Sequence, residues 1–244
     1  MELNNLVEEH FRQPHKYDNR KMKVIVKSQK SILSNDNIKW HLPDEMLWIT
    51  KYEYYADIEN SIANSVGSFN WLYEINDTVL FDKDTGRFET AIIDLSGKIC
   101  IGDLKIEISA GDEQKGDLFF VEGKNCDFEF PSSVIYAECV DYLVAFPKDA
   151  GKQEYIILYI VDDFGFIVIN DQLEGWILKN ASKHICMGQG SGDDIDRTLL
   201  ARYLNALKLW EEDDPTEIES FLGIIEARED SFSVVLKNCL TKLL

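Results

Sequence analysis

Residues 155–169 read YIILYIVDDFGFIVI and contain two apolar runs, 155–161 and 166–169, separated by four residues. Runs rich in isoleucine, valine and aromatic residues are typical of β-strands. A connection this short leaves no room for a crossover helix, so we expect the two strands to pair antiparallel. The first run does not alternate between apolar and polar residues, which predicts a central strand covered on both faces.

Similar short runs recur upstream, with turn residues between them, and closely spaced strands without intervening helices predict antiparallel pairing. Between residues 28 and 68 the aromatic residues fit a strand or a buried helix equally well. The further strands that we predict span residues 22–27, 69–75, 78–81, 87–95, 98–101, 104–109, 118–122, 127–130 and 134–146.

The last quarter of the chain changes to an apolar period of three to four residues, which is typical of amphipathic helices. We predict helices over 195–210, from 216 onward after the Asp214-Pro215 start signal, and over 231–244. Leucines, a valine and a phenylalanine at helical spacing predict another helix over 2–11.

The sequence therefore predicts an α+β fold with a mostly antiparallel sheet of about eight to ten strands, an N-terminal helix and a C-terminal layer of about three helices. No Pro/Gly/Ser-rich linker divides the chain, so we expect a single domain over 1–244, mainly β over 1–190 and helical over 191–244.

The chain is strongly acidic, with 44 acidic and 25 basic residues and a net charge of −19. Its first thirty residues hold seven basic and four acidic side chains, +3, so the remainder carries −22. Such a body repels nucleic-acid phosphates and anionic membranes and attracts basic proteins. The start of the chain does not resemble a signal peptide, so we expect a cytoplasmic protein without a nucleic-acid or membrane partner.

Motifs that could carry chemistry have simpler structural explanations. The glycine-rich segment 188–192 precedes three aspartates, which would repel a phosphate, so we interpret it as a connector and helix cap. The alternating acids of 82–86 lack a full calcium loop and predict a hairpin turn with Gly86 at positive φ. His10, His15, His41 and His184 lack zinc-site spacing. We therefore predict no catalytic residue, cofactor or metal site.

Acidic clusters are the remaining candidates for a partner-binding surface. Glu211 and Glu212 lie at the predicted C-terminal end of a helix, where the helix dipole disfavours each anion by about 0.3 to 1 kcal/mol. Their placement therefore favours a role other than helix stability. The candidate partner-binding residues are Asp112, Glu113, Asp117, Asp193, Asp194, Asp196, Glu211, Glu212 and Asp213.

The function that this surface favours is capture and neutralisation of a basic protein, as by an inhibitor or immunity protein that blocks a toxic nuclease. One alternative is a hydrolase with a carboxylate-based or metal-assisted site, which a pocket joining His41 or His184 to buried acids would favour. Another is an adaptor subunit whose basic N-terminal segment and acidic body contact different neighbours.

Overall fold

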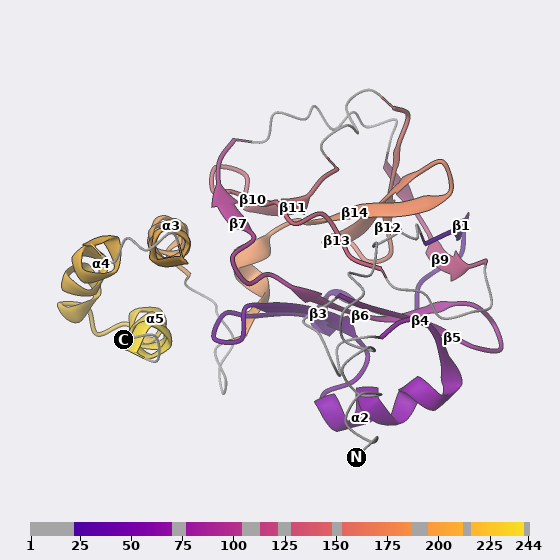
Figure 1. Cartoon of the computed structure of the whole chain (residues 1–244), viewed down its shortest axis with the longest axis horizontal. Coiled ribbons are helices and arrows are strands. Elements are labelled where there is room, and N and C mark those ends of the chain that lie inside the picture. Colours follow the sequence, from indigo (N-terminus) through magenta and orange to yellow (C-terminus); the bar gives the residue numbers. More distant parts are fainter. Residues whose placement is uncertain are drawn as a thin grey trace, which may run out of the picture.

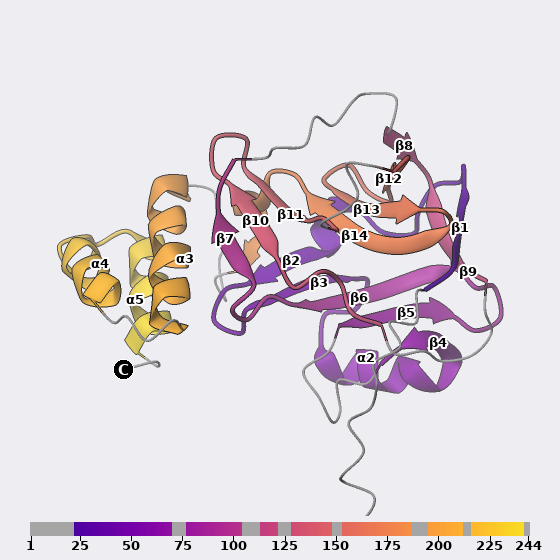
Figure 2. The same ribbon diagram turned by 45° about the horizontal axis from the view of Figure 1, so that its top comes forward.

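The computed structural model describes residues 22–69, 77–103, 113–121, 128–147, 153–186, 195–211 and 216–241. Two β-sheets lie face to face, and three helices stand together at one end of them (Figure 1). The same arrangement is seen after a turn of the molecule (Figure 2). Within the described part of the chain, no helix is long and apolar enough to cross a membrane.

The larger sheet has seven strands and contains the pair predicted from residues 155–169. These two strands are antiparallel, with Ile157 opposite Ile167, as predicted. The strand order is β7 (Ile99–Ile101), β10 (Val134–Ala137), β11 (Tyr142–Ala145), β14 (Gln172–Leu178), β13 (Phe164–Ile169), β12 (Ile156–Tyr159) and β8 (Glu113–Lys115).

Strand β12 is buried on both faces, but it is not central. Leu158 contributes to the main core, whereas Ile157 and Tyr159 lie in a second cluster with Ile167. The edge strand β8 lies beside β12, and the middle position belongs to β14, which is not among the predicted strands. Its Gln172-Leu-Glu-Gly175 start interrupts the apolar pattern that would have indicated a strand.

The second sheet has six strands, and a separate two-stranded ribbon pairs β1 (Val24–Lys27) with β9 (Asp117–Phe120). The prediction of antiparallel pairing is therefore correct for most neighbours but incomplete, because β7/β10, β8/β12 and β15/β2 are parallel. The six strands, in order, are β15 (Ile185–Cys186), β2 (Ile38–His41), β3 (Met46–Thr50), β6 (Phe88–Asp94), β5 (Thr78–Asp82) and β4 (Ser65–Ser68).

The ambiguous segment 28–68 contains both kinds of structure. Besides β2, β3 and β4 it holds the helix α2 (Tyr55–Ser61) and the short 3-10 helices η1 (Asn35–Asn37) and η2 (Ile62–Asn64). Helix α2 covers the outer face of the six-stranded sheet, where Ile58 is buried in a cluster with Leu80 and Ile92 (Figure 1).

The three predicted C-terminal helices are present as α3 (Arg197–Glu211), α4 (Thr216–Glu226) and α5 (Ser231–Thr241). The predicted helix over 2–11 and the predicted strand over 104–109 lie outside the described residues, as does most of the predicted strand over 69–75. Two predicted strands need correction. Residues 128–130 are irregular, and the run 134–146 is a hairpin, β10 and β11, rather than one strand.

One hydrophobic core fills the space between the sheets and continues into the helices. The rings of Phe88 and Phe166 meet across the two sheets with their centroids 5.0 Å apart, and those of Trp40 and Tyr136 are 6.2 Å apart. Leu200 of α3 belongs to the same cluster. The helices therefore share buried apolar surface with the strands, which is the main source of folding free energy.

Gly223 weakens α4 without a compensating contact. A Cβ atom added at this position would meet nothing within 4 Å. Because glycine in a helix interior costs about 0.5 to 1 kcal/mol relative to alanine, we expect Gly223→Ala to raise the free energy of unfolding by about that amount. Urea unfolding monitored by circular dichroism measures it, and a lower stability would contradict the open environment of this site.

Candidate functional site

The structure describes the side chains of three of the nine predicted partner-binding residues: Glu113, Asp117 and Asp196. Glu211 ends α3, and its side chain is outside the described set. The other predicted residues, which also lie outside the described ranges, are Asp112, Asp193, Asp194, Glu212 and Asp213.

Asp117 is buried in β9 rather than exposed to a partner. Its carboxylate forms an ion pair with Arg87 and accepts a hydrogen bond from its neighbour's backbone, Leu118 N, at 2.9 Å. Burial raises the pKa of Asp117, and the Arg87 contact opposes that shift. Arg87 also donates to the carbonyl oxygen of Lys30, so this pair fixes the ribbon against the sheet.

Glu113 and Asp196 are accessible but already paired. Glu113 accepts hydrogen bonds from Lys179 Nζ at 2.9 Å and Tyr159 Oη at 3.1 Å, and the Lys179 contact lowers the pKa of Glu113. Asp196 accepts from the backbone of Leu199 at the start of α3 and pairs with Arg228 at 3.1 Å. Strand β8 and helix α3 lie at opposite ends of the molecule (Figure 2), so these acids do not form one patch.

The hairpin turn predicted at 82–86 is confirmed. Asp82 Oδ1 accepts hydrogen bonds from the backbone and the hydroxyl of Thr85, at 2.7 and 2.6 Å. Gly86 has a φ of 70°, the left-handed conformation that glycine adopts without strain. These contacts lower the pKa of Asp82 and show the aspartate closing the turn between β5 and β6.

Asp141, whose position in the fold was not predicted, accepts three hydrogen bonds in the interior. It receives them from Tyr136 Oη at 3.1 Å, Ser182 N at 3.0 Å and Ser182 Oγ at 2.7 Å. This network connects the β10–β11 turn to the segment after β14. A single aspartate inside the apolar run 134–146 was the sequence signal for it.

Asp77 is a second buried acid that sequence reasoning missed. Its two carboxylate oxygens accept from Asp94 N at 2.9 Å and Phe130 N at 2.7 Å. Burial raises the pKa of Asp77 to about 6, because desolvation disfavours its charged form.

This raised pKa predicts a pH-dependent contribution to stability. A group whose pKa is higher in the folded state stabilises the fold fully below pH 4, and the contribution is lost as the pH rises through about 6. Relative to Asp77→Asn, the parent should lose about 2 to 3 kcal/mol of unfolding free energy between pH 4 and pH 7. Urea titrations of both proteins across this pH range measure the difference between their free energies of unfolding. A difference that does not change with pH would contradict the raised pKa of Asp77.

The described histidines are held by structural contacts. His184 Nε2 lies 3.1 Å from Asp163 Oδ2, and the same carboxylate accepts from Asn35 at 3.0 Å and Asn180 at 2.8 Å. His41 packs against Trp48 with the ring centroids 4.9 Å apart, and burial lowers its pKa. Among the described residues, no group of three His, Cys, Asp or Glu side chains could hold a metal ion.

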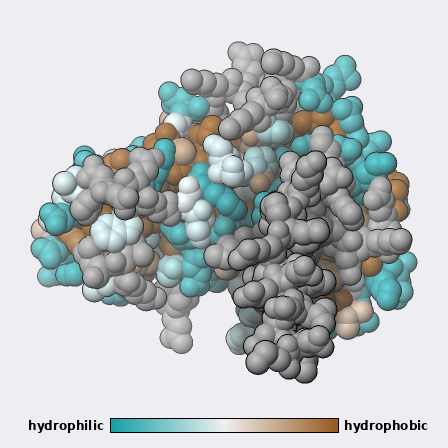
Figure 3. Space-filling model, in the orientation of Figure 1, coloured by the Kyte–Doolittle hydropathy of each residue, from teal (hydrophilic) through white to brown (hydrophobic). Residues whose placement is uncertain are grey.

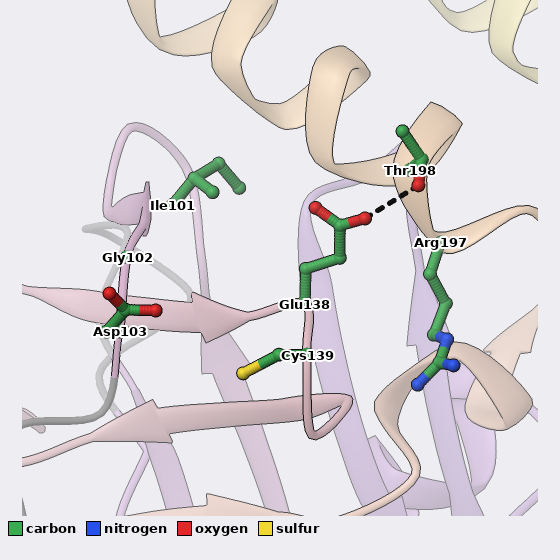
Figure 4. Close-up of a pocket in the computed structure, with 7 residues that line it drawn as sticks. All are labelled: Ile101, Gly102, Asp103, Glu138, Cys139, Arg197 and Thr198. Atoms are coloured by element: carbon green, nitrogen blue, oxygen red, sulfur yellow. Dashed lines mark hydrogen bonds between the residues drawn. The ribbon is translucent and has the colours of Figure 1, made fainter.

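A cavity of about 590 Å³ lies between the end of β7, the β10–β11 turn and the start of α3 (Figure 4). Thr198 Oγ1 donates to Glu138 at 2.7 Å on one wall, and Arg197 extends away from that pair. A second cavity of about 540 Å³ between α3 and α4 shares Ile101, Glu138 and Thr198. No histidine is among the described residues that line either cavity; the first carries the carboxylates Asp103 and Glu138, and the second Glu138 and Glu217.

A third cavity, of about 700 Å³, lies between the loop 28–36 and the segment that follows β12. Its wall carries Lys30 and Lys115 together with Asp36 and Asp162. Lys115 pairs with Asp162 at 2.7 Å, and the charges of the wall are balanced. The charges of the described lining residues therefore sum to zero.

The start of α2 exposes an aromatic side chain, Tyr54, in a stretch of the chain that also carries Glu53, Asp57 and Glu59. Tyr54 is 69% exposed, and the three acids are exposed as well. Elsewhere, in the view of Figure 3, hydrophobic residues reach the surface as small patches among hydrophilic ones. The sequence signal was the stretch 53–59, EYYADIE, within a segment whose structure the pattern left open.

The described acids thus include structural carboxylates inside the fold and exposed carboxylates on its surface. Comparison of the chain with protein-family models, with curated proteins and with solved structures finds no significant match.

Proposed function

We propose that this protein is an acidic protein-binding module that captures and neutralises a basic protein, as an inhibitor or immunity protein does with a toxic nuclease. The observation that supports the proposal is an excess of exposed carboxylates over available cations. No described lysine or arginine forms an ion pair with the exposed acids Glu53, Asp57, Glu59, Asp84, Asp103, Glu217, Glu219, Glu226 and Glu229.

The buried acids do not account for this excess. Asp94 and Asp117 pair with Lys98 and Arg87, so each pair contributes no net charge. Asp77 and Asp141 are buried without such a pair, and leaving both out changes the net charge from −19 to −17. Most of the negative charge therefore remains available to act on a partner at long range.

The proposed mechanism is electrostatic capture followed by occlusion. A nuclease binds phosphates through a basic groove, and an acidic protein is attracted to the same groove. Complementary potentials speed diffusional encounter, most strongly at low ionic strength. Once bound, the acidic protein would exclude nucleic acid from the groove. We further propose that this takes place in the cytoplasm.

The test is affinity capture from native lysate on the immobilised chain, followed by a salt gradient and mass spectrometry. We expect the retained proteins to be strongly basic and to elute as salt rises, because ion-pair attraction is screened. The control matrix carries a variant of the chain in which exposed acidic side chains are replaced by their neutral amides. A retained set with no enrichment in basic proteins, or one that resists salt, would count against the proposal.

The two alternatives receive less support. A cavity that joins His41 or His184 to buried acids would favour a hydrolase, and neither histidine lines the three cavities described above. The adaptor hypothesis depends on the basic N-terminal segment, most of which lies outside the described residues.

A further inference from the structure

A lysine of the helical layer contacts a cysteine of the larger sheet. Lys208 Nζ in α3 lies 3.3 Å from Cys100 Sγ in β7, although the two residues are 108 positions apart in the chain. Strand β7 is an edge strand of its sheet, and it lies beside α3 in both views of the molecule (Figure 1 and Figure 2). The contact therefore bridges two elements that are distant in sequence and adjacent in space.

The hydrogen bond itself gives little reason for this pairing. A thiol sulfur is a weak acceptor, so the contact contributes less to stability than a hydrogen bond to an oxygen atom would. Cys100 and Lys208 are both partly exposed to solvent. Reactive cysteines are typically partly exposed and lie beside a cationic side chain, and Cys100 meets both conditions.

The other described cysteines lack this arrangement. Cys139 is exposed and Cys186 is partly buried, and within the described ranges no lysine donates a hydrogen bond to either thiol. Cys239 is buried. Cys100 is thus the described cysteine that is both partly exposed and in contact with an amine, which is the combination that a bond between sulfur and nitrogen requires.

We propose that Cys100 and Lys208 form an oxidative cross-link, a sulfenamide, that fastens α3 to β7. In the first step hydrogen peroxide oxidises the thiol by two electrons, giving a sulfenic acid and one molecule of water. The lysine then releases its ammonium proton to water, and its neutral amine attacks the sulfenic sulfur. The S–N bond forms, the S–O bond breaks, and the hydroxyl leaves as a second water with a proton from nitrogen. Excess thiol reverses the link, returning the cysteine and the amine while the reductant becomes a disulfide.

The cross-link makes the attachment of the helical layer dependent on the oxidation state of the surroundings. It closes a loop of about the 108 residues that separate the two side chains, and a link across a long loop restricts the unfolded chain strongly. We therefore expect the cross-linked chain to have a Tm about 5 to 10 °C higher than the reduced chain. Capture of a basic protein has no part in this chemistry, so the two proposals stand or fall separately.

The test treats the full chain with hydrogen peroxide at neutral pH, blocks the remaining thiols with iodoacetamide and analyses the digest by mass spectrometry. We expect a peptide pair joined at Cys100 and Lys208, lighter than the sum of its two peptides by two hydrogen atoms and separated by dithiothreitol. It should form about tenfold faster or more in the native chain than in urea, because the fold holds the two groups together. Equal rates in urea, or Cys100 recovered as a sulfinic acid or a disulfide without a link to Lys208, would overturn the proposal.

Lys208→Arg is the matched variant, because it keeps the positive charge and the hydrogen-bond donors but has no nucleophilic amine. We expect it to melt at the same temperature as the parent when both are reduced, and to form no cross-link with peroxide. Cys139→Ser should leave the cross-link unchanged, since no described lysine donates to that exposed thiol. A peroxide-induced rise in Tm that is equal in the parent and in Lys208→Arg would show that the link does not fasten α3 to the sheet.

Discussion

Replacing Asp141 with alanine should lower the free energy of unfolding by about 3 to 5 kcal/mol, because the change removes a buried acceptor that serves three donors. The hydroxyls of Tyr136 and Ser182 and the backbone N–H of Ser182 would all lose their partner in the interior. Urea unfolding of the variant and the parent measures the loss. Activity or binding assays are not needed for this test.

A matched control separates the hydrogen-bond network from backbone strain. Asp141 has a φ of 58° and Asp171 has a φ of 60°, so alanine is strained to a similar degree at both positions. Asp171 is exposed, and among the described residues its side chain has no hydrogen-bond partner. We expect Asp171→Ala to cost about 1 kcal/mol. Similar losses in the two variants would show that the network contributes little.

Gly175→Ala should destabilise the protein by about 3 kcal/mol or more, because it forces apart two strands in the middle of the larger sheet. A Cβ atom at this position would lie 2.3 Å from the carbonyl oxygen of Ala145 in β11. Backbone atoms held in a sheet cannot move aside as a flexible side chain can. Thermal unfolding should show a large drop in Tm, of about 5 °C or more.

Gly165→Ala in the adjacent strand β13 is the control for this effect. Its Cβ would meet side-chain atoms of Ile157 and Tyr159 at 3.1 Å, and no backbone atom is among its three nearest contacts. We expect a loss of about 1 kcal/mol, since side chains can adjust by a few tenths of an ångström. A Gly175 variant as stable as the Gly165 variant would contradict the close approach of β14 and β11.

The sequence indicated the strands and helices better than their arrangement. The antiparallel pair of β12 and β13 and the three C-terminal helices follow from apolar periodicity, which local side chains determine. Strand β14 was missed because Gly175 is required by the neighbouring backbone, a constraint that exists only in the assembled sheet. The parallel pairs also exist only in the assembled sheet. Strands β7 and β10, for example, are separated by more than thirty residues along the chain, and the sequence does not show that they pair.

The candidate site was less predictable than the fold. Composition shows how many carboxylates the chain carries but not which of them are used inside it. Asp117, predicted to face a partner, is buried against Arg87, whereas Glu113 is exposed but paired with Lys179. The exposure of Tyr54 could not be predicted from the sequence, because it depends on where α2 begins.

The parallel pairing of β15 with β2 bears on how the chain folds during synthesis. Ile185 pairs with Trp40, and Cys186 with His41, so one neighbour of β2 is made nearly 150 residues after it. Until then the backbone groups along that edge of β2 must remain bonded to water or to other chains. Closing a contact of such length is also slow, because distant segments must meet by diffusion. We therefore expect the nascent six-stranded sheet to be completed late, with its exposed edge vulnerable to aggregation while the ribosome is still extending the chain.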